Sequence, residues 1–437
     1  MGKGIKRYYS IIIAAAVSLI SFTLTTCNPT EPISPEPKPP GYQEDIPWPS
    51  LADSPWPMHH GNPQSNGRSK YLGPQLGILE WRIEIPSSEL NSSSLTSPVI
   101  ANDSTIIFIS GNEPGDTNTF LYSVSSKGIV NWKFPIVGDS LIPDPFETHT
   151  PPIVNSQNNI YVFASNGYLY SINLRGGLNF RKYLNIGTLG RVNIGKDGNF
   201  YITGMDGILY CISPLGEVLW QVKYGNGFQG FTTGSITFSP DGKIIYVKGF
   251  KRFSMPVRGN TLSAIDINGG FLWSFDNGEN ISSFIPPTDF QGNIYLWTQE
   301  VSELPFFGLI CLTFNGEIKY FNDDIVNSVG NDPAIDYDGN IFLANSEIVS
   351  LDYKGNERWR KLFYAPTSES SSAIVCDGAG NIYLTNDDGI LLNIDNNGNL
   401  KWSLDMEGKC YTSPAINSDG RIYIGTVGVK NYFNCVK

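Results

Sequence analysis

The side chains most suited to binding a metal ion lie at residues 336–340, which read DYDGN. Two carboxylates and an amide at this spacing match the first half of a calcium-binding loop, where oxygen atoms are the ligands. Such a loop also requires a later glutamate and flanking helices. The same place elsewhere in the chain reads GKDGN, SPDGK or NSDGR. We therefore predict hairpin turns in which Asp, Asn and Gly serve backbone shape.

Histidine could provide metal ligands or a general base, but the chain has only three. His59 and His60 are adjacent, and neighbouring side chains of an extended segment point to opposite sides, so they chelate one ion poorly. No spacing of cysteines or carboxylates supports a zinc site around these two residues or around His149. The sequence also contains neither a G-x-S-x-G elbow nor a P-loop. We predict no catalytic residues, no metal site and no cofactor site.

One repeat accounts for most of the chain. A small residue, a Gly five positions later and an aromatic residue four positions after that recur without a change in spacing. The pattern predicts a third strand, a tight turn with φ > 0 at Gly, and a fourth strand that carries a large aromatic side chain. The seven copies are Ser123–Trp132, Ser171–Phe180, Cys211–Trp220, Ala264–Trp273, Cys311–Tyr320, Ser350–Trp359 and Asn393–Trp402.

A second strand with an aromatic residue precedes each copy, and a short first strand completes an antiparallel meander. The eighth repeat reaches Cys435 and stops at Lys437 without a fourth strand, whereas Gly77 and Trp81 repeat the spacing near the N-terminus. An N-terminal strand in the last sheet would close a ring and protect its edges. We predict an all-β, eight-bladed β-propeller. The second-strand aromatics are Phe108, Tyr161, Tyr201, Tyr246, Tyr295, Phe342, Tyr383 and Tyr423.

Cysteine usage follows the repeat. Cys211, Cys311 and Cys435 stand at the small-residue position of the third strand, which predicts small buried side chains. Cys376 and Cys410 have no assigned role. Five cysteines follow the signal region and its Cys27, so at least one is unpaired within a monomer. We predict no disulfide framework.

Short runs within the repeats, S-P-A-I, I-Y-I-G, L-Y-x-I and G-x-x-x-W, resemble the pyrroloquinoline-quinone-like (PQQ-like) propeller family. The nearest copies are Ser413–Ile416 and Ile422–Gly425, and the resemblance covers residues 56–437. Residues 56–69 resemble the segment that opens these propellers, and we predict that they cap the closing blade. The family contains enzymes and scaffolds, so the resemblance implies the fold and leaves the function open.

The enzymes of this family are quinone-dependent dehydrogenases, and the resemblance implies a quinone and a calcium ion over the propeller axis. It also implies two adjacent cysteines, an acidic base and acidic or amide calcium ligands. This sequence has no adjacent cysteines, and none of the other positions can be matched. The long insertions that build the enzyme site are missing as well. We predict a protein that is not an enzyme and keep a quinone-dependent dehydrogenase as the alternative.

The first 26 residues read as a secretory signal, with a basic start and an apolar core too short to span a bilayer comfortably. Residues 24–27, LTTC, resemble a bacterial lipobox, which implies cleavage before Cys27 and lipid attachment there. Asn28 resembles the sorting signal for the outer membrane. Residues 27–50 are rich in proline and predict an extended tether, and residues 51–437 are assigned to the propeller.

Charge excludes one class of partner. The formal charge of −11 becomes −14 when the signal and its three basic residues are removed. Such an acidic body is a poor candidate for general nucleic-acid binding. The unbroken repeat predicts one domain, a monomeric propeller.

Long loops between second and third strands occur at Gly111–Thr119, Gly249–Asn260 and Thr298–Phe307. Insertions on one face of a repeat protein often mark its binding face. Aromatic residues edged by charge are typical of a contact patch, although they could instead cover the blade tops. The candidate partner-binding residues are Phe250, Lys251, Arg252, Phe253, Arg258, Phe306 and Phe307.

These features together predict a lipid-anchored scaffold of the bacterial envelope, on the periplasmic or cell-surface side of the outer membrane. The anchor and the fold make the chain similar to the propeller lipoproteins of the outer-membrane β-barrel assembly machine. The resemblance implies outer-membrane assembly components as partners. A propeller that binds carbohydrate or another surface ligand is a further alternative.

Overall fold

The computed structural model describes residues 38–86, 94–111, 119–136, 150–164, 167–184, 186, 192–204, 207–224, 235–249, 261–275, 280–281, 285–299, 308–324, 332–344, 346–363 and 372–437. Residues from Pro40 to Lys437 form one compact unit. Within the described ranges, no helix is long and apolar enough to cross a membrane.

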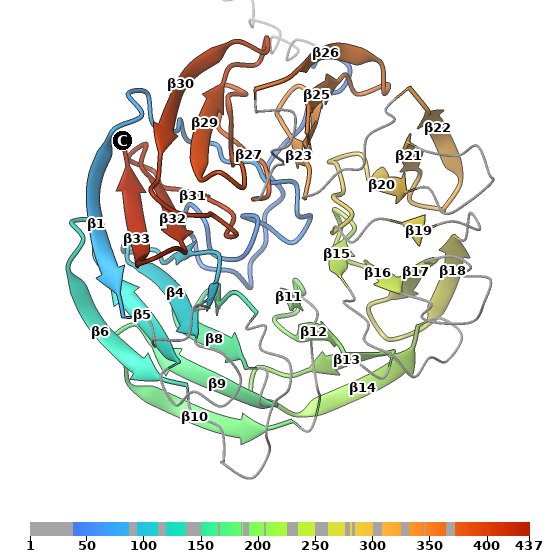
Figure 1. Ribbon diagram of the computed structural model, residues 1–437. Helices are drawn as coiled ribbons and strands as arrows, with labels where there is room; N and C mark the ends of the chain where they lie inside the picture. Colours follow the sequence, from blue (N-terminus) through green and yellow to red (C-terminus); the bar gives the residue numbers. More distant parts are fainter. Residues whose placement is uncertain are drawn as a thin grey trace, which may run out of the picture. The chain divides into compact units, whose positions relative to one another are not determined.

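Eight antiparallel sheets form a ring, which confirms the predicted eight-bladed propeller (Figure 1). Blades 1 to 7 are built from consecutive strands, whereas blade 8 combines the last three strands of the chain with β1 (Leu79–Ile85). β1 pairs with β33 (Asn431–Val436), and Trp81 lies opposite Cys435. The predicted closure of the ring by an N-terminal strand is therefore confirmed.

Each blade has an inner strand at the axis, then a second and a third strand, and an outer strand at the rim. The inner strands are β3 (Val99–Ile100), β7 (Ile153–Val154), β11 (Asn193–Ile194), β15 (Ile236–Phe238), β23 (Ala334–Ile335), β27 (Val375–Cys376) and β31 (Ala415–Ile416), and blade 5 has the Thr288–Ile294 bridge. The second strands are β4 (Ile106–Gly111), β8 (Asn159–Phe163), β12 (Phe200–Thr203), β16 (Ile244–Gly249), β20 (Ile294–Gln299), β24 (Ile341–Ala344), β28 (Ile382–Thr385) and β32 (Ile422–Thr426).

The third strands are β5 (Phe120–Val124), β9 (Tyr168–Asn173), β13 (Ile208–Ile212), β17 (Thr261–Asp266), β21 (Gly308–Leu312), β25 (Ile348–Leu351), β29 (Ile390–Ile394) and β33. The outer strands are β6 (Val130–Pro135), β10 (Leu178–Tyr183), β14 (Val218–Lys223), β18 (Phe271–Phe275), β22 (Ile318–Asn322), β26 (Glu357–Lys361), β30 (Leu400–Asp405) and β1. Two short strands, β2 (Ser94–Leu95) and β19 (Asn280–Ile281), pair with the ends of β4 and β20.

The Gly-to-aromatic spacing joins neighbouring blades. The repeat glycines have positive φ, for example +82° at Gly398. A Cβ atom there would lie 2.8 Å from the indole of Trp359 in the preceding blade, so only glycine permits this approach. Trp359 Nε1 also donates a hydrogen bond to the Asn396 carbonyl of the same turn. Gly77 meets Trp402 in the same way, which links blade 7 to the closing strand.

The small-residue position lies between aromatic side chains. Cys211, for example, pairs with Tyr201 on the second strand and Trp220 on the outer strand. Its side chain is fully buried, as predicted for this position. Phe108 lies on the second strand of blade 1, as predicted, but Ile107 and not Phe108 pairs with Ser123. Phe108 consequently faces the other side of its strand and stacks on Phe433 of blade 8.

Candidate functional site

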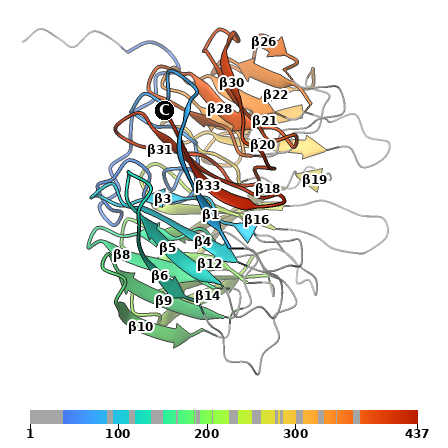
Figure 2. The same cartoon turned by 60° about the vertical axis from the view of Figure 1, so that its left-hand side comes forward.

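Residues 41–73, called the strap below, lie across the axis on one face of the ring, at the left in Figure 2. Strap carbonyl groups accept hydrogen bonds from inner-strand N–H groups at the same position of six blades. In each blade this inner-strand residue pairs with a second-strand residue, and the next residue of the second strand is the one that pairs with the small-residue position. The donor and acceptor pairs are Ile100–Trp56, Val154–Pro57, Phe238–Pro63, Thr288–Gln64, Ile335–Asn66 and Cys376–Gly67, at 2.7–3.1 Å.

These bonds satisfy donors that would otherwise be buried at the free edge of each inner strand. The strap therefore does at the axis what an additional strand would do at the edge of a sheet. We expected residues 56–69 to cap the closing blade. The structure instead places them across six other blades, because the free inner edges of those blades converge at the axis.

The two adjacent histidines belong to this strap. His59 Nε2 lies 3.3 Å from Asp332 Oδ2, and Asp332 Oδ1 accepts a bond from the Ile285 N–H. The His60 ring nitrogens lie 2.8 Å from the carbonyl oxygens of Ser65 and Ile374. A neutral imidazole donates through one ring nitrogen, and the tautomer decides which of the two carbonyl groups accepts that bond.

The histidine rings do not point to opposite sides of the chain. They stack with 5.7 Å between their centres and 22° between their planes. The expectation assumed an extended segment, but His60 has a φ of +57°. The left-handed conformation turns both rings inward, and both side chains are buried.

A buried lysine lies close to Asp332. Lys248 is on β16 and is fully buried, and burial lowers its pKa to about 7, partly opposed by the attraction of Asp332. His59, Asp332 and Lys248 therefore form a buried polar cluster at the axis. Such a cluster can hold protons, but its three members are between 0% and 7% exposed. This burial favours a role in fixing the strap.

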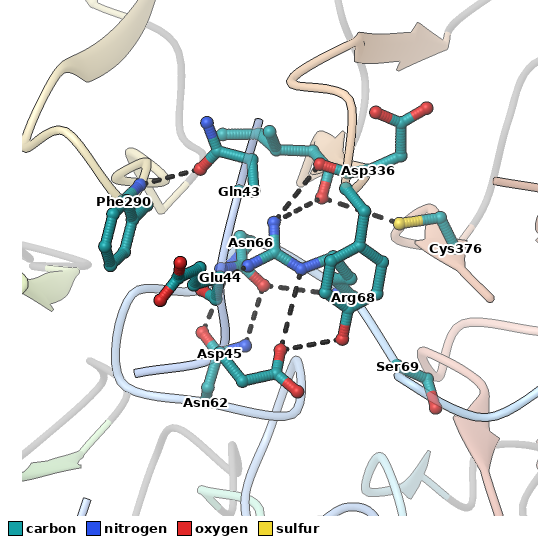
Figure 3. Close-up of polar contacts among 12 residues, drawn as sticks. Gln43, Glu44, Asp45, Asn62, Asn66, Arg68, Ser69, Phe290, Asp336 and Cys376 are labelled. Atoms are coloured by element: carbon teal, nitrogen blue, oxygen red, sulfur yellow. Dashed lines mark hydrogen bonds and ion pairs between the residues drawn. The ribbon is translucent and has the colours of Figure 1, made fainter. Parts of the chain in front are cut away.

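Arg68 connects two limbs of the strap to blade 6 (Figure 3). Its Nη1 donates to the carbonyls of Ile335 and Asp336, both at 3.2 Å, and its Nη2 donates to the Glu44 carbonyl at 3.0 Å. The guanidinium also lies over the Tyr337 ring, with 4.5 Å to the centroid. Since the Arg68 side chain is almost completely buried, these contacts fix the path of the strap.

A cavity of about 500 Å³ lies beside this network and is lined almost entirely by the strap. Its walls include Trp48, Gln64, Arg68 and Tyr71, and Ser156 contributes from blade 2. Trp48 is fixed by a bond from Nε1 to the Ile194 carbonyl, at 2.8 Å. The volume is suitable for a small ligand, but most of the polar lining already takes part in strap contacts.

The DYDGN segment is a turn, as predicted. Asp336 Oδ1 accepts bonds from the backbone N–H groups of Asp338 and Asn340, at 2.9 and 2.8 Å. The Asn340 side chain donates to the other carboxylate oxygen. In the equivalent turn of blade 5, Tyr295 also donates to the Asp289 carboxylate. These aspartates stabilise the turn between inner and second strands. Among the described residues, no group of three or more His, Cys, Asp or Glu is arranged to hold a metal ion.

The five described cysteines are free thiols, and all are buried. Burial raises the pKa of Cys211 to about 11 and that of Cys410 to about 12. It also raises the pKa of Cys376 well above its usual value. Since the thiolate is the reactive form, these cysteines are poor nucleophiles and serve as small buried side chains.

The residues predicted for lipid attachment and partner binding lie outside the described part of the chain. The structure therefore does not show whether the loop residues come together, and those assignments stay predictions. They are Cys27, Phe250, Lys251, Arg252, Phe253, Arg258, Phe306 and Phe307.

Sequence reasoning missed the contributions of Arg68, Asp332 and Lys248. A lysine at the end of the apolar run IIYVKG was the one available signal, because charged residues are rarely buried without a partner. Arg68 gave no local signal. Its carbonyl partners at Ile335 and Asp336 are far away in sequence.

Comparison with known proteins supports the fold. No family model matches the sequence, and no curated protein matches it. BamB from Moraxella catarrhalis is similar in structure, with a TM-score of 0.55, 13% identity, and coverage of 82% of this chain and 99% of that chain. Quinohemoprotein alcohol dehydrogenase from Comamonas testosteroni gives a TM-score of 0.60 at 10% identity, covering 87% and 80%.

Another similar structure is a europium-containing methanol dehydrogenase, with a TM-score of 0.59, 12% identity, and coverage of 86% and 90%. Identities this low establish the propeller fold and leave the activity open. At the strap end of the axis, the strap backbone occupies the position against the inner strands of six blades. The chain is thus an eight-bladed propeller whose fold is shared by BamB and by quinoprotein dehydrogenases.

Proposed function

We propose that the protein is a non-catalytic, lipid-anchored propeller of the bacterial envelope that acts as a protein-interaction scaffold. The observation that carries this proposal is the strap, which fills one end of the axis with the chain's own backbone. The inner edges of six blades are bonded to it, so this end of the propeller is a structural centre. Binding is then a property of the outer surfaces, as is common among propeller proteins.

The anchor and the partner rest on the sequence. The LTTC segment predicts a lipid on Cys27, and the proline-rich tether would hold the propeller near the outer membrane. Similarity of fold to BamB supports a role with outer-membrane assembly components as partners. The aromatic and basic residues from Phe250 to Arg258, with Phe306 and Phe307, are the proposed contact residues on the loop face.

Crosslinking and capture from native membranes tests this proposal. The full-length chain with Cys27 intact should recover barrel-assembly proteins or nascent barrels, and a Cys27→Ser variant should recover much less of them. Truncation of the loop aromatics to alanine should reduce recovery, whereas truncation of the exposed Tyr411 should not. Specific capture of other envelope proteins would support a scaffold with different partners. No specific capture with either variant would contradict the scaffold function.

A quinone-dependent dehydrogenase is the second candidate, because quinoprotein dehydrogenases match the fold as well as BamB does. It predicts stoichiometric quinone binding in the presence of calcium and dye-linked oxidation of alcohols. Titration of the purified full-length chain with quinone and calcium separates the two functions. Saturable binding at one molecule per chain would favour the enzyme, and its absence would favour the scaffold.

A further inference from the structure

Outer strands at the rim of a blade have one edge that is not paired within the sheet. Free edges invite pairing with another strand, and proteins commonly prevent it by placing charged side chains, especially lysine, on them. Seven of the eight outer strands carry at least one charged residue. The exception is β18 of blade 4, whose sequence is FLWSF. Figure 1 shows β18 at the rim between β14 and β22.

Each outer strand has a bulge at its second residue, and the residue type at this position differs between blades. In six blades it is polar or charged, and several of these side chains bond to neighbouring groups, as Arg358 does to Ser350 Oγ at 2.8 Å. In blades 3 and 4 it is leucine, at Leu219 and Leu272. The six others are Glu80, Asn131, Asn179, Lys319, Arg358 and Lys401.

Exposed apolar side chains occur on the outer strands and the turns before them in most blades, Ile129 and Leu178 among them, and seven of them lie on blades 3 to 5. Phe271 and Leu272 on β18 are 58% and 45% exposed. The neighbouring blades contribute Leu215, Val218, Leu219, Phe314 and Ile318, each at least 46% exposed. Blades 4 and 5 are in contact here, since Trp273 Nε1 on β18 donates to the Phe314 carbonyl in the turn of blade 5. An apolar surface of this extent, beside an uncharged strand edge, is typical of an interaction site.

We propose that β18 is a docking edge, where an extended strand of a partner protein with apolar and basic side chains adds to the sheet of blade 4. Backbone hydrogen bonds to the free edge would provide affinity, and contacts with Phe271 and Leu272 would set the register. This inference deepens the proposed scaffold function and rests on it, since it supplies a surface for the partner.

Charge favours a basic partner over a second copy of this chain. The protein carries a net charge of −11, and the exposed carboxylate of Glu317 and the partly exposed one of Asp266 lie at the turns beside the patch. A basic side chain also lies beside the patch, that of Lys319 on β22, and its ammonium donates to Asn293 Oδ1. A second copy would bring the same excess of negative charge to the interface. A strand with lysine or arginine beside its apolar residues would instead meet opposite charge.

A defined peptide tests the docking edge on the full-length protein in detergent micelles. The probe is a fluorescent, disulfide-closed β-hairpin whose outer strand alternates valine and lysine. Binding is measured by anisotropy. We expect the double substitution Phe271→Lys and Leu272→Lys to weaken binding at least tenfold. The control is Leu400→Lys, at the position of β30 equivalent to Phe271, which is also exposed. It should leave binding unchanged.

A second probe separates strand addition from general apolar contact. A hairpin of the same sequence with N-methyl groups along its outer strand cannot donate backbone hydrogen bonds and should not bind. Equal binding of both hairpins, or equal weakening by Leu400→Lys, would overturn the proposal. A dimer of the protein that the double substitution dissociates would also overturn it, in favour of a second copy.

The result is distinct from that of the membrane capture experiment. If the double variant still captures envelope proteins at the normal level, the docking edge is wrong and the scaffold function stands. If capture fails for the unmodified chain, the scaffold function is wrong whatever the hairpin does. Melting curves of the double variant and of Leu400→Lys should coincide with the unmodified chain, because all three side chains are exposed.

Discussion

The axis and the rim of this propeller invert the usual arrangement of polar and apolar groups. At the axis, His59, Asp332, Lys248 and Arg68 are buried, and His59, Asp332 and Arg68 take part in hydrogen bonds or ion pairs around the strap. At the rim of blades 3 to 5, large apolar side chains are exposed. Buried polar groups must all be satisfied and therefore fix one arrangement of the chain, whereas exposed apolar groups remain available. The buried groups at the axis therefore stabilise the architecture, and the docking edge that we propose lies at the rim.

Removing the Arg68 side chain should give the largest effect. Arg68→Ala removes three hydrogen bonds to backbone carbonyl groups and opens a space beside Tyr337, so we expect a loss of about 3–5 kcal/mol in the free energy of unfolding. Urea denaturation measures it. Arg358→Ala removes a less buried arginine at the rim and should cost about 1 kcal/mol. Equal losses would contradict the division between axis and rim.

Blade docking through glycine should come next. Gly398→Ala places a Cβ atom 2.8 Å from Trp359 and forces an L-residue into positive φ. We therefore expect the free energy of unfolding to fall by about 2–3 kcal/mol. Gly198→Ala has the same φ of +82°, but its Cβ would lie 4.0 Å from Ser50. That control should lose only about 1 kcal/mol. Thermal unfolding of both variants separates backbone strain from the contact with tryptophan.

Burial of Lys248 at the axis should make the free energy of unfolding depend on pH. The pKa of its ammonium is about 7 in the folded protein and about 10.4 in an unfolded chain, so between these values the unfolded state binds more protons. The free energy of unfolding should therefore rise with pH in this window. Relative to Lys248→Met, the unmodified chain should gain about 2 kcal/mol between pH 7.5 and 9.5. A constant difference would show that Lys248 is not neutralised by burial.

The charged edge of the closing blade provides a contrast with β18. Glu80 on β1 accepts bonds from both Nε and Nη2 of Arg421, and this pairing lowers the Glu80 pKa to about 2. Its contribution is present above the unfolded pKa of about 4.3 and is lost as pH falls toward 2. Because both side chains are partly exposed, we expect Glu80→Gln to cost about 1 kcal/mol at pH 7 and nothing near pH 2. Urea titrations at both pH values test this.

The sequence was sufficient for the fold because its signals are local. A glycine five residues after a small residue indicates a turn with positive φ, and the aromatic residue four positions later packs against the equivalent turn of the next blade. The N-terminal copy at Gly77 and Trp81 identified the closing strand by the same rule. The offset in blade 1 arose because two successive residues, Ile107 and Phe108, are both apolar and only pairing distinguishes them.

The strap could not be predicted in the same way. Its bonds join residues that are hundreds of positions apart, and its acceptors are backbone carbonyls, which every residue carries. The orientation of His59 and His60 depended on a left-handed residue that is not glycine, for which the sequence gives little warning. The loop residues Phe250 to Arg258 and the lipid attachment at Cys27 stay predictions, since they lie outside the described ranges.

Ring closure by β1 and β33 also has a consequence for biogenesis. β1 is synthesised long before its partner β33, so the eighth blade cannot form until the residues of β33 have been synthesised. Contacts this distant in sequence slow folding and leave strand edges exposed in the meantime. Until β33 has been synthesised, the edge of β1 has no partner strand, and a chaperone that binds exposed strand edges would have time to act on it.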